Sequence, residues 1–189
     1  MRGLSVALAF CLVVLPSSAS AQVEYRVVAT NKTSTTEKEM NEAADAGFRF
    51  GGVMGGDTAF GGSEVVTVMH RVDQAAAGRF AYRLLAANKT STMQKEMQEA
   101  GDAGYEYRGQ TVFKTMFGGK EAVVILERDK DVKDGPAYDY RLLATSKTST
   151  LQKELTEAGA AGFQFVGVTV GNTAVGGAEV VAILRRTRK

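Results

Sequence analysis

The sequence of 189 residues has no tryptophan and contains one cysteine, one histidine and two prolines. The cysteine is Cys11, so from residue 22 onward the chain can form neither a disulfide bond nor a thiolate metal site. One histidine, His70, cannot supply a three-histidine metal centre or an active site repeated along the chain, and we expect it on the surface near the end of a strand. With no nucleophile–base pair or metal-ligand spacing either, we predict a non-enzymatic protein without a cofactor.

A strong charge of one sign is also missing. The 23 basic residues nearly balance the 21 acidic ones, for a formal net charge of +2. A nearly neutral chain has no global field that attracts nucleic acid or anionic lipid, so we predict no nucleic-acid partner. The apolar run from Leu4 to Leu15 is shorter than the ~20 residues of a membrane-spanning helix, so stable membrane insertion is not expected.

Residues 1–21 have the layout of a secretory signal peptide. A short basic start precedes the apolar run, and the small residues Ala19-Ser20-Ala21 form a cleavage site. We therefore predict cleavage after Ala21 and a periplasmic or secreted protein. A lipid anchor on Cys11 has less support, because Phe10 is bulky where a small residue is required.

The rest of the chain contains three copies of one stretch of sequence. The copies run from Tyr25 to Arg71, from Tyr82 to Arg128 and from Tyr140 to Arg186, and they align without a gap. We therefore divide the chain after the signal peptide into three repeats, at residues 22–73, 80–129 and 137–189.

Each copy begins with a predicted strand, followed by a predicted helix. In the first copy Val23, Tyr25 and Val27 alternate with polar residues, which is typical of a strand. The following apolar residues recur every three or four positions, which indicates a helix with one apolar side. These helix positions are Thr36, Met40, Ala43 and Ala44, then Met93, Met97 and Ala100, then Leu151, Leu155 and Ala158. Gly47, Gly104 and Gly162 occupy the position of a left-handed helix cap.

Two more strands complete each copy. The second begins with two aromatic residues, Phe48 and Phe50 in the first copy, and leads into a glycine-rich connection over residues 55–62. The third, residues 64–69, is apolar on both faces, as expected of a central strand. The fold class is therefore α+β: β-α-β-β units with the third strand between the first two and the helix on one face. Units this small need shared cores, so we expect them to stack sheet against sheet or around a pseudo-threefold axis.

This pattern resembles a bacterial family of small domains of unknown function. The residues that carry the resemblance are Tyr-x-apolar-apolar, a helix ending Ala-x-x-Gly-aromatic-x-aromatic, and a strand closing on Arg. The chain differs in its three tandem copies and in having Phe or Tyr where a Trp often follows the glycine. The resemblance implies the β-α-β-β fold and no activity. The element order is also similar to that of dodecins, in topology alone.

The motif Lys-Thr-Ser-Thr at each helix start is the leading candidate site. A helix N-terminus with hydroxyls and a lysine favours an anionic ligand. The alternative is a purely structural helix cap, because Ser34 with Glu37, Ser91 with Gln94 and Ser149 with Gln152 fit a capping box. The candidate ligand-binding residues are Lys32, Thr33, Ser34, Lys89, Thr90, Ser91, Lys147, Thr148 and Ser149.

The sequence leaves three functions open, of which an enzyme has the least support because no nucleophile–base pair or metal-ligand spacing is present. The first is an exported structural or protein-interaction module, which binds an unknown protein or self-associates through apolar strand faces. The second is a small-ligand binding protein, which holds an anion at the helix starts or a flat aromatic ligand between units beside Phe48 and Phe50.

Overall fold

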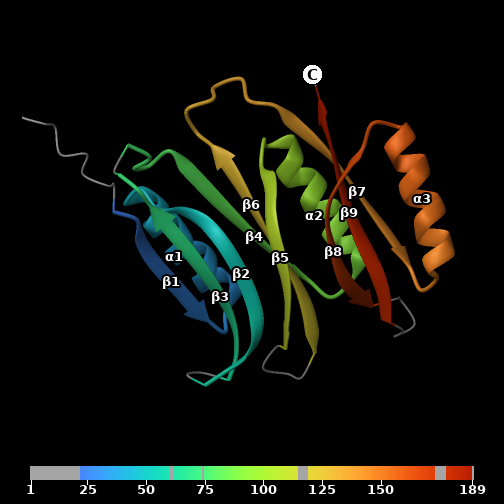
Figure 1. Cartoon of the computed structure of the whole chain (residues 1–189), viewed down its shortest axis with the longest axis horizontal. Coiled ribbons are helices and arrows are strands. Elements are labelled where there is room, and N and C mark those ends of the chain that lie inside the picture. The colour runs from blue at the N-terminus through green and yellow to red at the C-terminus, as the bar shows by residue number, and fades with distance from the viewer. Residues whose placement is uncertain (1–21, 60–61, 74, 115–118, 173–177, 189) are drawn as a thin grey trace, which may run out of the picture.

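The computed structural model describes residues 22–59, 62–73, 75–114, 119–172 and 178–188, so the predicted signal peptide lies outside the described residues. The described part consists of three units, which we call unit 1 (residues 22–73), unit 2 (80–129) and unit 3 (137–188) (Figure 1). Their elements are β1 (Glu24–Thr30), α1 (Thr33–Asp45), β2 (Arg49–Thr58), β3 (Gly62–Arg71), β4 (Phe80–Ala87), α2 (Thr90–Asp102), β5 (Glu106–Lys114), β6 (Lys120–Asp129), β7 (Ala137–Thr145), α3 (Thr148–Ala160), β8 (Gln164–Asn172) and β9 (Ala178–Arg188).

Each unit is a three-stranded antiparallel sheet with the predicted β-α-β-β order. The sheets are ordered β1-β3-β2, β4-β6-β5 and β7-β9-β8, which confirms that the apolar third strand is central. Register is shared as well: Val27 pairs with Val68, and the equivalent pairs are Leu84 with Ile125 and Leu142 with Ile183. The second strand of every unit carries a β-bulge two residues after its start.

The glycine caps predicted at the helix ends are confirmed. Gly47, Gly104 and Gly162 have φ values of 86°, 80° and 82°, in the left-handed region that glycine adopts without strain. The amide of Phe48 donates to Ala43 O at 3.0 Å, which closes a Schellman motif.

The capping boxes predicted at the helix starts are wrong. Each helix begins one residue before the serine, the N-cap residues are Lys32, Lys89 and Lys147, and none of them makes a side-chain cap hydrogen bond. The partners expected to close the boxes point elsewhere, because Glu37 and Gln94 hydrogen-bond to the next unit instead.

The three units lie in a row, with unit 1 and unit 3 on opposite sides of unit 2 (Figure 1). The arrangement is thus a stack and not a pseudo-threefold ring. In unit 2, one face of the sheet lies toward unit 1, and the other lies toward α2 and unit 3. We call these the front face and the back face, and we use the same names for the equivalent faces of units 1 and 3.

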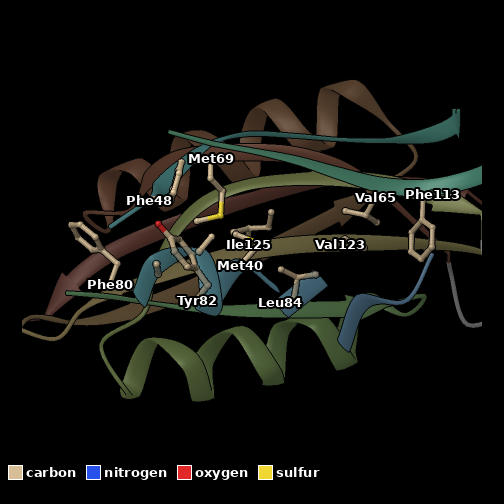
Figure 2. Close-up of a cluster of buried hydrophobic side chains, with 12 residues drawn as sticks. Met40, Phe48, Val65, Met69, Phe80, Tyr82, Leu84, Phe113, Val123 and Ile125 are labelled. Atoms are coloured by element: carbon tan, nitrogen blue, oxygen red, sulfur yellow. The ribbon is translucent and has the colours of Figure 1, made fainter. Parts of the chain in front are cut away.

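The hydrophobic cores lie mainly between units (Figure 2). In the first, Met40 and Met69 of unit 1 meet Tyr82 and Ile125 of unit 2. The second core joins the back face of unit 2 to Tyr138, Tyr140 and Ile183 of unit 3. The third is smaller and contains residues of unit 3 alone. A unit therefore completes its core by contact with its neighbour.

The glycine-rich segment of unit 1 is largely strand, which corrects the expected connection over residues 55–62. β2 continues to Thr58, and β3 starts at Gly62. A Cβ on Gly55 would lie 2.7 Å from the carbonyl oxygen of Val112 in β5. Glycine is therefore needed here because β2 and β5 of neighbouring units pack backbone against backbone.

Candidate interaction surfaces

The edge strand of unit 2 is hydrogen-bonded by side chains from the helix of unit 1. Asn41 of α1 donates from Nδ2 to Tyr82 O at 3.0 Å and accepts from Tyr82 N at 2.9 Å. Glu37, one turn earlier, accepts from Leu84 N at 2.7 Å. A free edge strand would otherwise leave these backbone groups for water or another chain. The helix thus takes the place of a missing strand.

The junction between units 2 and 3 repeats this arrangement. Gln98 of α2 accepts from Tyr140 N at 3.0 Å, and Gln94 accepts from Leu142 N at 2.7 Å. Their amide nitrogens donate to Tyr138 O at 3.2 Å and Tyr140 O at 2.9 Å. Asn41 and Gln98 occupy equivalent positions, as do Glu37 and Gln94, so the two junctions are built to one plan.

A tyrosine hydroxyl connects each bulge to the next unit. Tyr82 OH accepts from the amide of Phe50 at 2.8 Å, and Tyr140 OH accepts from the amide of Tyr107 at 2.6 Å. Burial raises the pKa of both hydroxyls, so they stay protonated and also donate. Each tyrosine hydroxyl therefore satisfies the backbone amide of the residue directly before the bulge.

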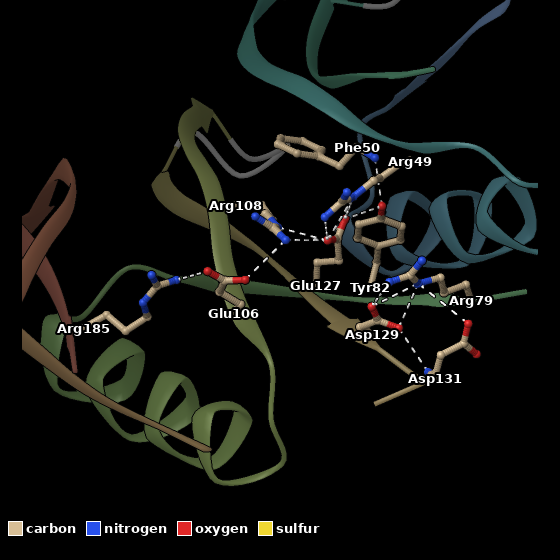
Figure 3. A network of polar contacts seen from close by, with 10 residues as sticks. All are labelled: Arg49, Phe50, Arg79, Tyr82, Glu106, Arg108, Glu127, Asp129, Asp131 and Arg185. Atoms are coloured by element: carbon tan, nitrogen blue, oxygen red, sulfur yellow. Dashed lines mark hydrogen bonds and ion pairs between the residues drawn. The ribbon is translucent and has the colours of Figure 1, made fainter. Parts of the chain in front are cut away.

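A buried carboxylate lies at the centre of the first junction (Figure 3). Glu127 is 3% exposed and accepts from Tyr82 OH at 2.7 Å, from Arg49 of unit 1 at 2.9 Å and from Arg108 at 2.7 Å. Burial raises the pKa of Glu127, but the hydrogen bonds from Arg49 and Tyr82 and the charge of Arg108 outweigh it, so the pKa falls below its ordinary value. The carboxylate is therefore charged at neutral pH.

The second junction carries the opposite pair of charges. Glu106 of unit 2 replaces Arg49, and Arg185 of unit 3 replaces Glu127; the two form an ion pair (Figure 3). Exchanging the units would place like charges together at a junction, which costs free energy. The reversed polarity therefore fixes which unit follows which.

Glycines mark where two units approach most closely. A Cβ on Gly101 of α2 would collide with the carbonyl oxygen of Tyr138 and would lie 2.9 Å from the Tyr140 ring. A Cβ on Gly109 of β5 would lie 3.2 Å from the Phe50 ring of unit 1. These positions are small because the neighbouring unit occupies the space beside them.

The same positions are uncovered at the first end of the row. Tyr25 of β1 is 70% exposed, whereas the equivalent Tyr82 is 3% exposed. Val27 is 62% exposed, whereas the equivalent Leu84 is 9% exposed. Gly52, equivalent to Gly109, has nothing within 4 Å of a Cβ. We call this front face of unit 1 the β1 face; its exposed large apolar residues are Val23, Tyr25, Val27, Met54 and Val68.

At the other end of the row, the back face of unit 3 is partly uncovered. Gly159 of α3, equivalent to Gly101, has nothing within 4 Å of a Cβ. Phe165, equivalent to the bulge residues Phe50 and Tyr107, is 57% exposed. We call α3 and the open part of the back face of unit 3 the α3 face; its exposed large apolar residues are Phe165, Val168, Val170 and Val180. The two faces hold nine of the eleven exposed large apolar residues found among the described residues.

The Lys-Thr-Ser-Thr motifs lie at the helix starts, as expected, but they are not brought together in one site. Lys32, Lys89 and Lys147 are exposed, as are Ser34, Ser91 and Ser149. Thr90 donates to Glu179 of unit 3 at 2.7 Å, so a carboxylate of the chain itself occupies this helix start. Thr33 and Thr148 begin the other two helices.

A pocket of about 330 Å³ lies beside the charge network, under the segment that joins units 2 and 3. Arg49, Arg108 and Glu127 line it together with Asp102 and Asp129. These five charges already pair within the chain, whereas Arg128 and Lys133, which also line the pocket, have no ion pair among the described residues. The described residues contain no cluster of three or more potential metal ligands, and no described helix is long and apolar enough to cross a membrane.

Reasoning from the sequence missed the residues that form the junctions. One pattern in the sequence could have indicated them: each of the first two helices carries two amide or carboxyl side chains one turn apart. These are Glu37 with Asn41, and Gln94 with Gln98. The tyrosine common to all three first strands was a second signal. Comparison with known proteins adds nothing to these observations: no family model matches the chain, and neither curated proteins nor solved structures gave a match.

Proposed function

We propose that this protein is an exported, non-enzymatic interaction module that binds polypeptide at the two ends of its row of units. The observation that carries this proposal is the contrast between equivalent residues. Tyr82, Leu84 and Tyr140 are buried at the internal junctions, whereas the equivalent Tyr25 and Val27 of unit 1 are exposed. Contiguous exposed apolar surface of this kind is typical of protein-binding sites.

The chemistry of the two faces suits a folded polypeptide partner. The β1 face combines apolar side chains with an edge strand. The backbone groups of an edge strand can pair with an extended chain or with side-chain amides of a helix. The α3 face presents a helix with Gln152 at the position that pairs an edge strand elsewhere in the chain. Small-ligand binding has less support, because Glu179 occupies one helix start and Phe48 and Phe50 pack into the first core.

Site-specific photo-crosslinking in the producing cells tests this function. A photoreactive amino acid replaces Tyr25 on the β1 face or Phe165 on the α3 face, and Lys95 on the exposed side of α2 serves as the control position. We expect protein adducts from both faces and none from position 95. If neither face gives an adduct with any protein, the chain is not an interaction module.

A further inference from the structure

We propose that the partner of each end face is a second copy of this chain: the α3 face of one copy binds the β1 face of the next. This inference rests on the proposed function and names its partner. Its basis is that the chain already contains the same junction twice, so the geometry of the contact between copies is visible within one molecule.

The β1 face is equivalent in sequence to the faces that are covered at the two internal junctions. Tyr25 and Val27 of the β1 face correspond to Tyr82 and Leu84, which α1 covers, and to Tyr140 and Leu142, which α2 covers. β1 thus carries the features that a preceding unit binds, including the tyrosine whose hydroxyl enters a bulge. No described residue covers it.

The helix α3 keeps features that bind a following unit at the internal junctions. Gln152 stands where Gln94 pairs the edge of β7, so it can pair the edge of β1 in a second copy. Among the described residues, its amide nitrogen donates to the Thr156 hydroxyl of its own helix, at 3.4 Å. The bulge of β8, beside the exposed Phe165, is the position where the Tyr25 hydroxyl of the second copy would be received.

Glycines at the two ends of the row indicate the same contact. Gly159 is exposed in the last turn of α3, where glycine is a poorer helix former than alanine, and no contact within the described residues requires it. At the equivalent Gly101 the absence of a side chain is what admits Tyr138 and Tyr140. Gly52, on the β1 face, also has nothing within 4 Å of a Cβ. At the first internal junction, the ring of Phe50 lies against the equivalent Gly109. Both glycines have a function only when another unit is present.

The junction between copies is weaker than the two internal ones, which makes it reversible. Gln164 stands in place of Arg49 and Glu106, and His70 in place of Glu127 and Arg185, so no opposite charges meet there. Thr156 replaces Asn41 and Gln98, and its hydroxyl donates to Gln152 O of its own helix at 2.9 Å. Because the two faces differ, a pair of copies still leaves one face of each kind uncovered. Copies therefore add head to tail into a ring or an open filament.

Sedimentation velocity of the purified protein over a concentration series tests this assembly. Val27→Lys places a charge on the β1 face, and Gly159→Arg fills the open position on the α3 face. Lys95→Ala, on the exposed side of α2, is the control. Circular dichroism and thermal melting check that all variants fold; Val27 is exposed and Gly159 has free space around it, so folding should be retained.

We expect wild type and Lys95→Ala to form concentration-dependent oligomers, and each end-face variant alone to remain monomeric with association weakened at least about tenfold. Mixing Val27→Lys with Gly159→Arg should yield a one-to-one dimer and no larger species, because each variant retains the face that the other has lost. A monomeric wild type, or a single variant that still dimerises with itself, would overturn the head-to-tail contact. The crosslinking experiment separates the two proposals: adducts from Phe165 with other proteins only would overturn self-assembly and leave the interaction module standing.

Discussion

The strands β1 and β4 begin with nearly the same residues and have opposite surroundings. Tyr25 and Val27 are open to solvent, whereas Tyr82 and Leu84 are covered by the preceding unit. Their register against the central strand is the same. The difference therefore comes from the neighbour and not from the strand itself. In a row of repeats, each face is a half-interface, and the end faces stay unfilled unless another molecule supplies the missing half.

The largest effect should come from Glu127, the buried carboxylate of the first junction. Glu127→Ala leaves Arg49 and Arg108 without their shared partner, and breaking a buried ion pair of this kind costs about 3 kcal/mol of unfolding free energy. His70→Ala at the equivalent position of unit 1 should change stability by less than about 0.5 kcal/mol. Urea unfolding of both variants measures the contrast; equal losses would show that the two positions do not differ as described.

Alanine at the two equivalent helix glycines should change stability in opposite directions. Gly101→Ala forces a Cβ against the Tyr138 carbonyl oxygen, and overpacking of this kind outweighs the gain in helix propensity, for a net loss of about 1 to 2 kcal/mol. Gly159→Ala meets nothing and should stabilise the protein by up to ~1 kcal/mol. Thermal unfolding at low protein concentration, where copies are separate, compares the two. A loss at both positions would contradict the open surroundings of Gly159.

Removing a tyrosine hydroxyl should lower the free energy of unfolding only where a neighbouring unit hydrogen-bonds to that hydroxyl. Tyr82→Phe deprives the Phe50 amide and Glu127 of a partner, so we expect a loss of about 1 to 2 kcal/mol. Tyr25→Phe should leave the free energy of unfolding of the separate monomer unchanged within about 0.5 kcal/mol. The check is chemical denaturation of both variants at the same dilution; a similar loss from Tyr25→Phe would place that hydroxyl in a contact within the chain.

The smallest effect should be a response of the first junction to acid. Because the folded pKa of Glu127 lies below its ordinary value, its stabilising contribution is complete above the unfolded pKa of about 4.3 and is lost as pH falls through the lower folded pKa. In Glu127→Gln this contribution is absent at every pH. The difference in unfolding free energy between wild type and the variant should therefore shrink below about pH 4.3. A difference that stays constant down to acid pH would mean that the carboxylate is not held charged by its partners.

The fold of each unit was predictable because its signals are local. Alternation in β1, the apolar side of α1 and the glycine after it each follow from short-range periodicity, and the doubly apolar β3 indicated the central position. The helices start at the expected motifs, but their capping was not predicted correctly. The pattern at Ser34 and Glu37 matches a capping box, and sequence alone could not show that Glu37 reaches the edge of the next sheet.

The candidate site was harder to predict because periodicity identifies a buried side but not the partner that buries it. Met40 could have packed on its own sheet alone; in the structure it meets both its own sheet and that of unit 2. The distinction between Gly101 and Gly159 is likewise invisible in the sequence, since both occupy the same helical position. Only the arrangement in a row shows which equivalent positions lack a neighbour.

Amide hydrogen exchange resolved by residue, measured at low and high protein concentration, tests the central claim most directly. The amide of Leu84 is hydrogen-bonded by Glu37 across a junction, and the equivalent amide of Val27 has no such partner among the described residues. Leu84 should exchange slowly at both concentrations, whereas Val27 should exchange rapidly in dilute protein and slow down as copies associate. A Val27 amide that exchanges at the same rate at every concentration would contradict an end face that a second copy fills.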